Sequence, residues 1–227
     1  MASEEAAGAK VVETEADRVA VADFLLRLRQ EGITDRRVLS AIEAVPRRLF
    51  VPHEARDTAY LERALPIECG QTISAPGLVA LMTAALDVGP NDLVLEIGTG
   101  SGYQAAILSH LAKHVYTVDR FRTLVESAEL RFKTLRITNI TALAGDGTLG
   151  WPANATFDRI ILTAATEKVP EALFDQLRVG GVLIAPIGPI DGVQVLTRIV
   201  KTREGTEESA LADVRFVPMI PGKAARL

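Results

Sequence analysis

The chain has 227 residues, of which 48% are hydrophobic, and a formal net charge of -4. This length and hydrophobic content predict a domain with a substantial core and exclude a mainly disordered chain. The acidic balance argues against a nucleic-acid surface, which needs a basic face, and no apolar run is long enough to cross a membrane. Cys69 is the only cysteine and the acidic start lacks a signal-peptide pattern, so we expect a cytoplasmic protein without disulfides.

The chain is expected to divide into a short tail and one domain. Residues 1–15 are rich in Ala and Glu and carry no apolar stripe, which predicts a mobile acidic tail. Residues 16–227 contain neither an internal repeat nor a linker, so we expect them to form a single domain.

Two helices are predicted after the tail. Apolar residues from Val21 to Leu28 share one face of the first helix, which ends at Gly32. Thr34 is expected to cap the second helix, with Pro46 just beyond its end. The apolar positions of this second helix are Val38, Ile42 and Val45. We expect both helices to pack beside the sheet, where they would help to cover a substrate.

The next segment, Leu65–Pro76, is expected to be irregular and to lead into a helix that stops near Gly89. Pro76 suits the first turn of that helix because proline lacks an N–H that the first turn leaves unpaired. Ser74 falls at or near the N-cap, and the local sequence alone favours a capping role and nothing more. The apolar positions of the helix are Leu78, Met82 and Leu86.

Strands and helices then alternate along the chain. Residues 121–135 form a strongly periodic helix, and residues 178–181 are expected to turn back into the sheet. Short apolar runs predict strands at 93–97, 115–118, 140–144, 159–163 and 182–187, the first of which has the pattern of a buried strand. This alternation predicts a doubly wound α/β sheet of parallel strands with helices on both faces.

Two strand-like runs, 193–200 and 211–217, follow the alternating region and are separated by polar residues 201–209. They most simply form an antiparallel hairpin at the edge of the sheet. The predicted fold is therefore α/β and Rossmann-like, with N-terminal helices and a C-terminal antiparallel hairpin.

A glycine-rich loop joins the strand at 93–97 to the next helix. Its glycines let the backbone turn tightly and let a ligand approach without meeting a Cβ atom. The N–H groups at the start of the helix would then face that ligand. In a dinucleotide fingerprint the third glycine would stand where this chain has Tyr103, and Glu96 before the loop would repel a diphosphate. The glycines concerned are Gly98, Gly100 and Gly102.

Two further acids follow the next two predicted strands. Asp119 is placed to accept both hydroxyls of a ribose, and Asp146 stands in the sequence Gly-Asp-Gly. Together with Glu96 they suit a ligand that carries a ribose, an adenine amine and an ammonium group, which favours S-adenosylmethionine over NAD. Each feature alone also fits a structural role, because glycine turns are common and acids often cap helices. Their combination in chain order favours the binding site.

These residues resemble a known family. The sequence from Val94 to Ala106 closely resembles motif I of the protein-L-isoaspartate O-methyltransferases, and Gly-Gln-Thr-Ile-Ser-Ala-Pro at 70–76 is similar to a segment specific to that family. Shorter similarities follow the family order at 45–52, 145–147, 157–158, 176–181 and 215–219. The resemblance spans roughly residues 20–220.

The resemblance implies S-adenosylmethionine-dependent methylation of the free α-carboxylate of L-isoaspartyl residues, with D-aspartyl residues as further candidates, in age-damaged proteins and peptides. The ester then collapses to a succinimide, part of which hydrolyses to normal aspartate. The methyl group is already activated and the carboxylate already ionised, so catalysis needs orientation more than a general base. The implied enzyme uses no metal, binds neither nucleic acid nor membrane, and is expected to be a monomer.

The resemblance also assigns roles to residues. Ser74 would be the catalytic residue that hydrogen-bonds the isoaspartyl carboxylate, which reverses the preference for a capping role. Residues implied for the substrate are Thr72 and Ile73 in the same pocket, and Val217 and Pro218 along the peptide. Residues implied for the cofactor are Glu96, Gly98, Thr99, Gly100 and Gly102 around its methionine half, Asp119 at the ribose, and Asp146 with Gly147 at the adenine.

The chain departs from the family pattern at two places. Many relatives have Gly-Gln or Gly-Phe before Gly70, where this chain has Glu68 and Cys69. Glu68 would repel a carboxylate substrate unless it points away or pairs with a cation such as Arg63. Thr148 stands where an aromatic residue often follows Gly-Asp-Gly, which would loosen the adenine edge.

Two alternatives stay open. One is a related carboxyl methyltransferase dedicated to one modified peptide or a small acid. The other is a non-catalytic protein that uses the fold to bind peptides or partners, against which the intact acids and Ser74 count. The histidines favour neither, because His110 and His114 are expected on the surface and His53 is only a slightly better catalytic candidate.

Overall fold

The computed structural model of the protein describes residues 15–153 and 155–224. The acidic tail expected at 1–15 lies outside these residues, apart from Glu15, which begins the first helix. Within the described residues, no helix is both long and apolar enough to cross a membrane.

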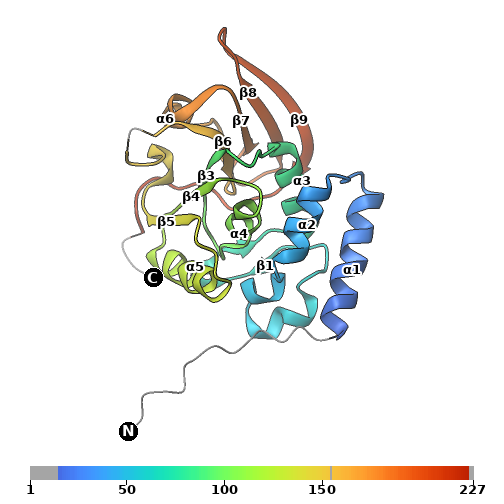
Figure 1. The fold of residues 1–227 in the computed structure, drawn as a ribbon. Coiled ribbons are helices and arrows are strands. Elements are labelled where there is room, and N and C mark those ends of the chain that lie inside the picture. The colour runs from blue at the N-terminus through green and yellow to red at the C-terminus, as the bar shows by residue number, and fades with distance from the viewer. Residues whose placement is uncertain (1–14, 154, 225–227) are drawn as a thin grey trace.

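A seven-stranded sheet forms the centre of the molecule (Figure 1). Its order is β5-β4-β3-β6-β7-β8-β9, parallel from β5 to β7 and antiparallel from β7 to β9. The strands are β3 (Leu93–Ile97), β4 (His114–Asp119), β5 (Ile140–Ala144), β6 (Phe157–Leu162), β7 (Leu177–Ile187), β8 (Gln194–Lys201) and β9 (Thr206–Val214). The chain runs outward from β3 to β5 and returns at β6 on the other side of β3. Ligands of such sheets bind where the order reverses, at the carboxyl ends of the strands.

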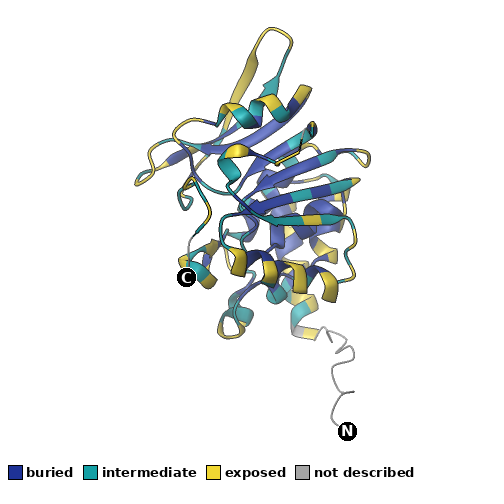
Figure 2. Ribbon diagram, turned by 90° about the vertical axis from the view of Figure 1, so that its left-hand side faces the viewer, coloured by how far each residue is buried: buried dark blue, intermediate teal, exposed yellow. Residues whose placement is uncertain are grey.

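Helices cover the two faces of the sheet unequally, which confirms the doubly wound α/β prediction. α3 (Pro76–Leu86), α4 (Tyr103–Ser109) and α5 (Arg122–Thr134) cover one face, and α6 (Glu171–Gln176) covers the other. Along β3, Val94 belongs to the core under α3, α4 and α5, whereas Leu95 and Ile97 belong to the core under α6. Each such burial stabilises the fold by about 1.5–3 kcal/mol. Figure 2 shows these buried layers between exposed outer surfaces.

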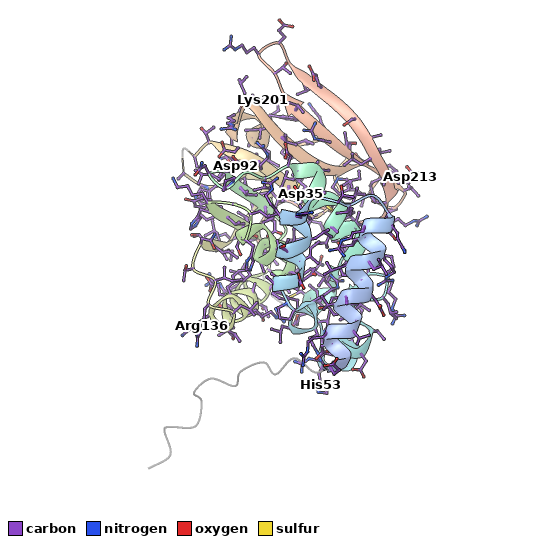
Figure 3. All side chains as sticks on the ribbon, turned by 45° about the vertical axis from the view of Figure 1, so that its right-hand side comes forward. Asp35, His53, Asp92, Arg136, Lys201 and Asp213 are labelled. Carbon is purple, nitrogen blue, oxygen red and sulfur yellow. The ribbon has the colours of Figure 1, made fainter. Side chains whose placement is uncertain are left out.

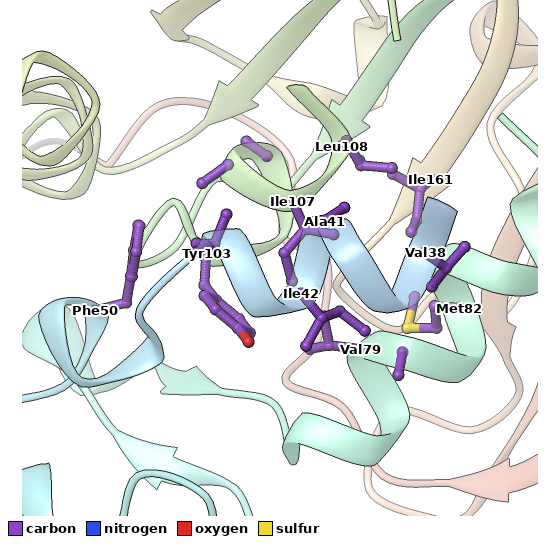
Figure 4. Close-up of a cluster of buried hydrophobic side chains, with 14 of the residues drawn as sticks. Val38, Ala41, Ile42, Phe50, Val79, Met82, Tyr103, Ile107, Leu108 and Ile161 are labelled. Atoms are coloured by element: carbon purple, nitrogen blue, oxygen red, sulfur yellow. The ribbon is translucent and has the colours of Figure 1, made fainter. Parts of the chain in front are cut away.

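The two N-terminal helices were expected to pack beside the sheet. They form an outer layer instead. α1 (Glu15–Gln30) packs on α2 (Arg36–Ala44), and α2 packs on α3 and α4. Every residue of α4 is buried, so this helix needs cover on the side facing away from the sheet. Apolar side chains of α2, α3 and α4 meet there (Figure 4), including Val38, Ile42, Val79, Met82 and Ile107.

Asp35 caps α2 in place of the expected Thr34. The N–H of Arg37 donates to Oδ1 of Asp35 at 2.8 Å, at the beginning of the helix (Figure 3). Asp35 directly precedes the first helical residue, so its short side chain reaches the unpaired N–H groups of the first turn. The predicted cap was one residue early.

The segment before α3 is more regular than expected. β1 (Leu65–Pro66) pairs in an antiparallel ladder with β2 (Thr72–Ile73). Four short 3-10 helices also occur in the described chain, which are η1 (Arg47–Phe50), η2 (His53–Thr58), η3 (Glu68–Gly70) and η4 (Gly147–Leu149). The N-cap position of α3 belongs to Ala75, so Ser74 does not occupy it.

Two boundaries at the end of the sheet also differ from the prediction. Residues 178–181 lie within β7, where the pairing shifts from Phe157–Leu177 to Arg159–Val182 and the extra residues bulge. The antiparallel hairpin is confirmed and projects from the molecule (Figures 1 and 2). Its second strand begins at Thr206, not at 211, because residues 206–209 form an exposed strand edge that needs no apolar side chains.

The cap assignment gives a test of local stability. Asp35→Ala should lower the free energy of unfolding by about 1 kcal/mol, because it leaves an N–H of the first turn unpaired. Thr34→Ala is the matched control and should change it by less than a few tenths of a kcal/mol. Urea denaturation of both variants measures this. A larger loss for Thr34→Ala than for Asp35→Ala would contradict the assignment.

Candidate functional site

The loop after β3 approaches its neighbours too closely for side chains. Gly98, Gly100 and Gly102 have φ angles of +102°, +53° and +87°, which favour glycine. A Cβ atom on Gly98 would collide with the side chain of Thr163, and one on Gly102 would lie 2.9 Å from the ring of Phe132. The hydroxyl of Thr163 donates to the carbonyl of Gly98 at 2.6 Å. The loop is thus fixed between β6 and α5.

An open cavity of about 890 Å³ lies between this loop, the segment around Ser74 and the C-terminal residues. Most of the predicted site residues line it, namely Thr72, Ile73, Ser74, Gly98, Thr99, Gly100, Asp119, Gly147, Val217 and Pro218. The structure therefore brings together residues that lie far apart in the sequence, at the reversal of strand order.

Three predicted site residues do not line the cavity: Glu96, Gly102 and Asp146. Gly102 lies against α5, as its contact with Phe132 shows. Glu96 is buried behind the loop and Asp146 is partly exposed beside the cavity, and both side chains have partners within the protein.

Asp119 lies at the carboxyl end of β4 and is 7% exposed. Its Oδ2 accepts the N–H of Gly100 and its Oδ1 accepts the N–H of Phe121, both at 2.9 Å. Burial raises the pKa of Asp119, against the lowering effect of these hydrogen bonds. Each carboxylate oxygen can accept more than one hydrogen bond, so Asp119 can still accept from a ligand in the cavity.

Glu96 is fully buried within β3. The hydroxyl of Thr117 donates to its Oε2 at 2.5 Å, so the hydroxyl of Thr99 is the donor in the 2.7 Å contact between the two threonines. The other oxygen, Oε1, has no partner among the described residues. Burial raises the pKa of Glu96 to about 8, and the nearby Asp119 adds to this shift. Glu96 therefore reaches the cavity only through the two threonines.

Asp146 holds two backbone segments in place. Its Oδ1 accepts both the N–H and the hydroxyl of Thr148, at 2.9 and 2.6 Å, and its Oδ2 accepts the N–H of Gly222 at 2.7 Å. The N–H of Ala224 donates to the carbonyl of Arg120. We call residues 217–224 the C-terminal strap, because they cross from β6 to the ends of β4 and β5.

The hydroxyl of Ser74 has no hydrogen-bond partner among the described residues, although Ser74 lines the cavity. The capping role favoured by local sequence is therefore wrong. The carbonyl of Ser74 accepts a hydrogen bond of 2.5 Å from Arg47. Its hydroxyl can serve a ligand because no protein group occupies it.

The two positions that depart from the family pattern make specific contacts. Glu68 lies 3.7 Å from the guanidinium of Arg131, not beside Arg63, so a cation offsets its charge. Thr148 bonds Asp146 and stabilises the turn in which an aromatic residue was expected.

The sequence missed several cavity residues, including Thr163, Gln104, Met219 and Ile220. Thr163 was detectable, since it follows β6 at the point where the strand order reverses. The histidines do not line the cavity, and His53 is exposed at one end of the molecule (Figure 3). No cluster that could hold a metal ion occurs among residues 15–153 and 155–224.

Comparisons with known proteins agree with this geometry. Residues 20–224 match the family described as Protein-L-isoaspartate(D-aspartate) O-methyltransferase (PCMT). The chain belongs to this family. The protein-L-isoaspartate O-methyltransferase of Azorhizobium caulinodans is 56% identical over 217 residues, which cover 96% of this chain and 100% of the relative. That of Xanthobacter autotrophicus is 54% identical over 95% of this chain and 98% of its own.

Solved structures of the family share the fold. A Plasmodium falciparum protein, described as a protein-L-isoaspartate O-methyltransferase in complex with S-adenosyl-L-homocysteine, is 27% identical with a TM-score of 0.76. The match covers 87% of this chain and 97% of that one. Another structure named protein-L-isoaspartate O-methyltransferase has a TM-score of 0.78 and 28% identity, over 87% of this chain and 65% of that one.

The buried acid Glu96 gives a prediction for a protein of this family. Its folded pKa of about 8 lies above the unfolded value of about 4.3, so the folded state holds a proton that the unfolded chain releases. The resulting stability is full below about pH 4 and is lost as the pH rises through about 8. Without ligand, the wild type should lose on the order of a few kcal/mol between pH 5 and 9, and Glu96→Gln should not.

Denaturation across that pH range measures the difference. Glu207→Gln, on exposed β9, is the control for loss of a surface carboxylate and should follow the wild-type curve. Parallel curves for Glu96→Gln and wild type would show that Glu96 is ionised in the folded protein.

Proposed function

We propose that this chain transfers the methyl group of S-adenosylmethionine to the free α-carboxylate of L-isoaspartyl residues in age-damaged proteins and peptides, with D-aspartyl residues as further candidates. The observation that carries the proposal is the cavity, where the Thr-Ile-Ser segment faces the glycine loop and Asp119. The family match over residues 20–224 supports the same reaction. The methyl ester then collapses to a succinimide, and part of it hydrolyses to normal aspartate.

The loop side of the cavity fits the donor. Gly98 and Gly100 offer backbone without side chains, so a ligand can lie directly against the loop. Asp119 is the proposed acceptor for the ribose hydroxyls. Apolar side chains suited to an adenine ring line the same region, among them Ile97, Val118, Phe121 and Ile220. When bound, S-adenosylmethionine supplies a methyl group activated by a positively charged sulfur.

Two of the predicted cofactor residues, Glu96 and Asp146, act in this proposal by holding neighbouring residues and not by lining the cavity. Glu96 holds Thr99 through Thr117, so that the hydroxyls under the loop keep one orientation. Asp146 holds the strap through Gly222 and leaves the backbone of Gly147 to face the adenine. A Cβ atom on Gly147 would lie 2.5 Å from Ile97, so this position also requires glycine.

The substrate side is built by β2 and the strap. Ser74 is proposed to donate its hydroxyl hydrogen bond to the isoaspartyl carboxylate, while Thr72 and Ile73 shape the pocket around it. Val217 and Pro218 are proposed to line the path of the peptide, since both face the same cavity. Holding an ionised carboxylate in line with the methyl–sulfur bond lowers the barrier through orientation, and no general base is required.

The monomer expected from the family resemblance stays a prediction. The single cysteine is consistent with a reducing cytoplasm as the setting.

Methylation of matched peptides tests the proposed function. With labelled S-adenosylmethionine, an L-isoaspartyl peptide should accept methyl groups, and the aspartyl peptide of the same sequence should not. Equal labelling of the two, or none, would defeat the proposal. Labelling confined to one particular sequence or to a small acid would favour a dedicated carboxyl methyltransferase instead.

Two variants should separate the sides of the cavity. Ser74→Ala should reduce methyl transfer by about 10- to 100-fold, the range expected for a hydrogen bond to a charged group, with nearly unchanged affinity for S-adenosylhomocysteine. Asp119→Ala should instead weaken S-adenosylhomocysteine binding by about tenfold or more. Calorimetry and initial rates measure both. A wild-type rate for Ser74→Ala, or a wild-type dissociation constant for Asp119→Ala, would refute the corresponding role.

A further inference from the structure

A buried guanidinium lies directly behind Ser74. Arg47, in η1, has no exposed surface, although arginine is almost never fully buried unless it is paired. Its Nη2 donates to the carbonyl of Ser74 at 2.5 Å and its Nε to the carbonyl of Ala59 at 2.7 Å. The ring of Tyr103 lies 4.8 Å from the guanidinium carbon. Ser74 and Tyr103 both line the cavity, so Arg47 forms the layer behind its wall.

The positive charge of Arg47 is not balanced by an ion pair. Across residues 15–153 and 155–224, no carboxylate lies within ion-pair distance of it, and its Nη1 has no hydrogen-bond partner. Burying a charge without an ion pair is costly. This desolvation lowers the pKa of the guanidinium and outweighs the opposing effects of Tyr103, Tyr60 and the more distant carboxylate of Glu62. Such a group is expected where an anion completes its environment during function.

Two anions take part in the proposed reaction, the substrate α-carboxylate and the carboxylate of the donor. The contacts of Arg47 favour the first. Its hydrogen bonds go to Ser74 and Ala59, whereas none goes to the loop 98–102 that forms the donor side. The carbonyl that it holds belongs to the same residue whose hydroxyl is free.

We propose that Arg47 is a positioning residue that makes the substrate side of the cavity selective for an ionised carboxylate. Its hydrogen bond fixes the backbone of Ser74, and its charge favours an anion beside the Ser74 hydroxyl. Because it lies behind the wall, Arg47 acts through Ser74 and through its field. This inference rests on the proposed function, since it takes the α-carboxylate of an isoaspartyl residue as the anion.

The test compares two peptides of one sequence, the isoaspartyl peptide and the neutral analogue in which an α-carboxamide replaces the carboxylate. Their affinities are measured with S-adenosylhomocysteine bound. Arg47→Met should reduce the preference for the carboxylate by about tenfold or more, with little change for the carboxamide, whereas Arg47→Lys should retain most of it. S-adenosylhomocysteine affinity should be unchanged in both variants. Arg159→Met is the matched control and should keep the full preference, since Arg159 also donates to backbone carbonyls but lies outside the cavity.

A variant that leaves Arg47 intact gives an independent measurement, should Arg47→Met fail to fold. In Ser74→Ala, the charge behind the wall should still favour the carboxylate over the carboxamide by about tenfold. Equal binding of the two peptides to Ser74→Ala would overturn the inference. An equal loss of affinity for both peptides in Arg47→Met would also overturn it. So would a loss of S-adenosylhomocysteine affinity in Arg47→Met with the preference for the carboxylate peptide unchanged. Any of these results alongside normal isoaspartyl methylation would leave the proposed function standing.

Discussion

The close approach of the loop after β3 to Thr163 and Phe132 is the constraint on which the site depends. Side chains at Gly98 or Gly102 would push the loop away from β6 or α5. Held in place, the loop brings the N–H of Gly100 to Asp119 at the end of β4. The cavity therefore opens where the strand order reverses, with bare backbone on one side and the Ser74 segment on the other.

Charge is distributed across the cavity in a way that matches the two ligands of a methyl transfer. The proposed donor side has the carboxylate of Asp119 at its wall, which suits a cationic ligand, whereas Glu96 behind the loop holds a proton below about pH 8. The proposed substrate side has Arg47 behind Ser74, which suits a carboxylate. Such an arrangement favours opposite charges on the two ligands and brings the methyl group and its acceptor together without a strong base.

The sequence was sufficient for the parts of the fold that depend on local pattern. The runs 93–97 and 140–144 became β3 and β5 with the predicted bounds, because both are short, mainly apolar runs that end at a glycine-containing turn. The start of β9 was missed because an exposed edge strand carries polar residues that read as a loop. The outer placement of α1 and α2 depends on which helix already covers the sheet, and periodicity contains no such information.

The site could be predicted as far as residue identity but not as far as side-chain direction. Spacing after successive strands located Asp119 at the cavity, since a strand end fixes the position of the next residue. The same rule placed Glu96 and Asp146 there, yet their carboxylates turn to Thr117 and to Gly222. These partners come from other parts of the chain, so only the folded structure identifies them. Arg47 was not predicted as a site residue for the same reason, because its hydrogen-bond partner Ser74 lies 27 residues away in the sequence.

A crystal structure with both S-adenosylhomocysteine and an isoaspartyl peptide bound tests the central claim most directly. The account predicts the nucleoside against Gly98 and Gly100 with its ribose hydroxyls on Asp119, and the peptide α-carboxylate hydrogen-bonded to Oγ of Ser74. A peptide carboxylate held by other residues, or a nucleoside bound away from the glycine loop, would contradict it.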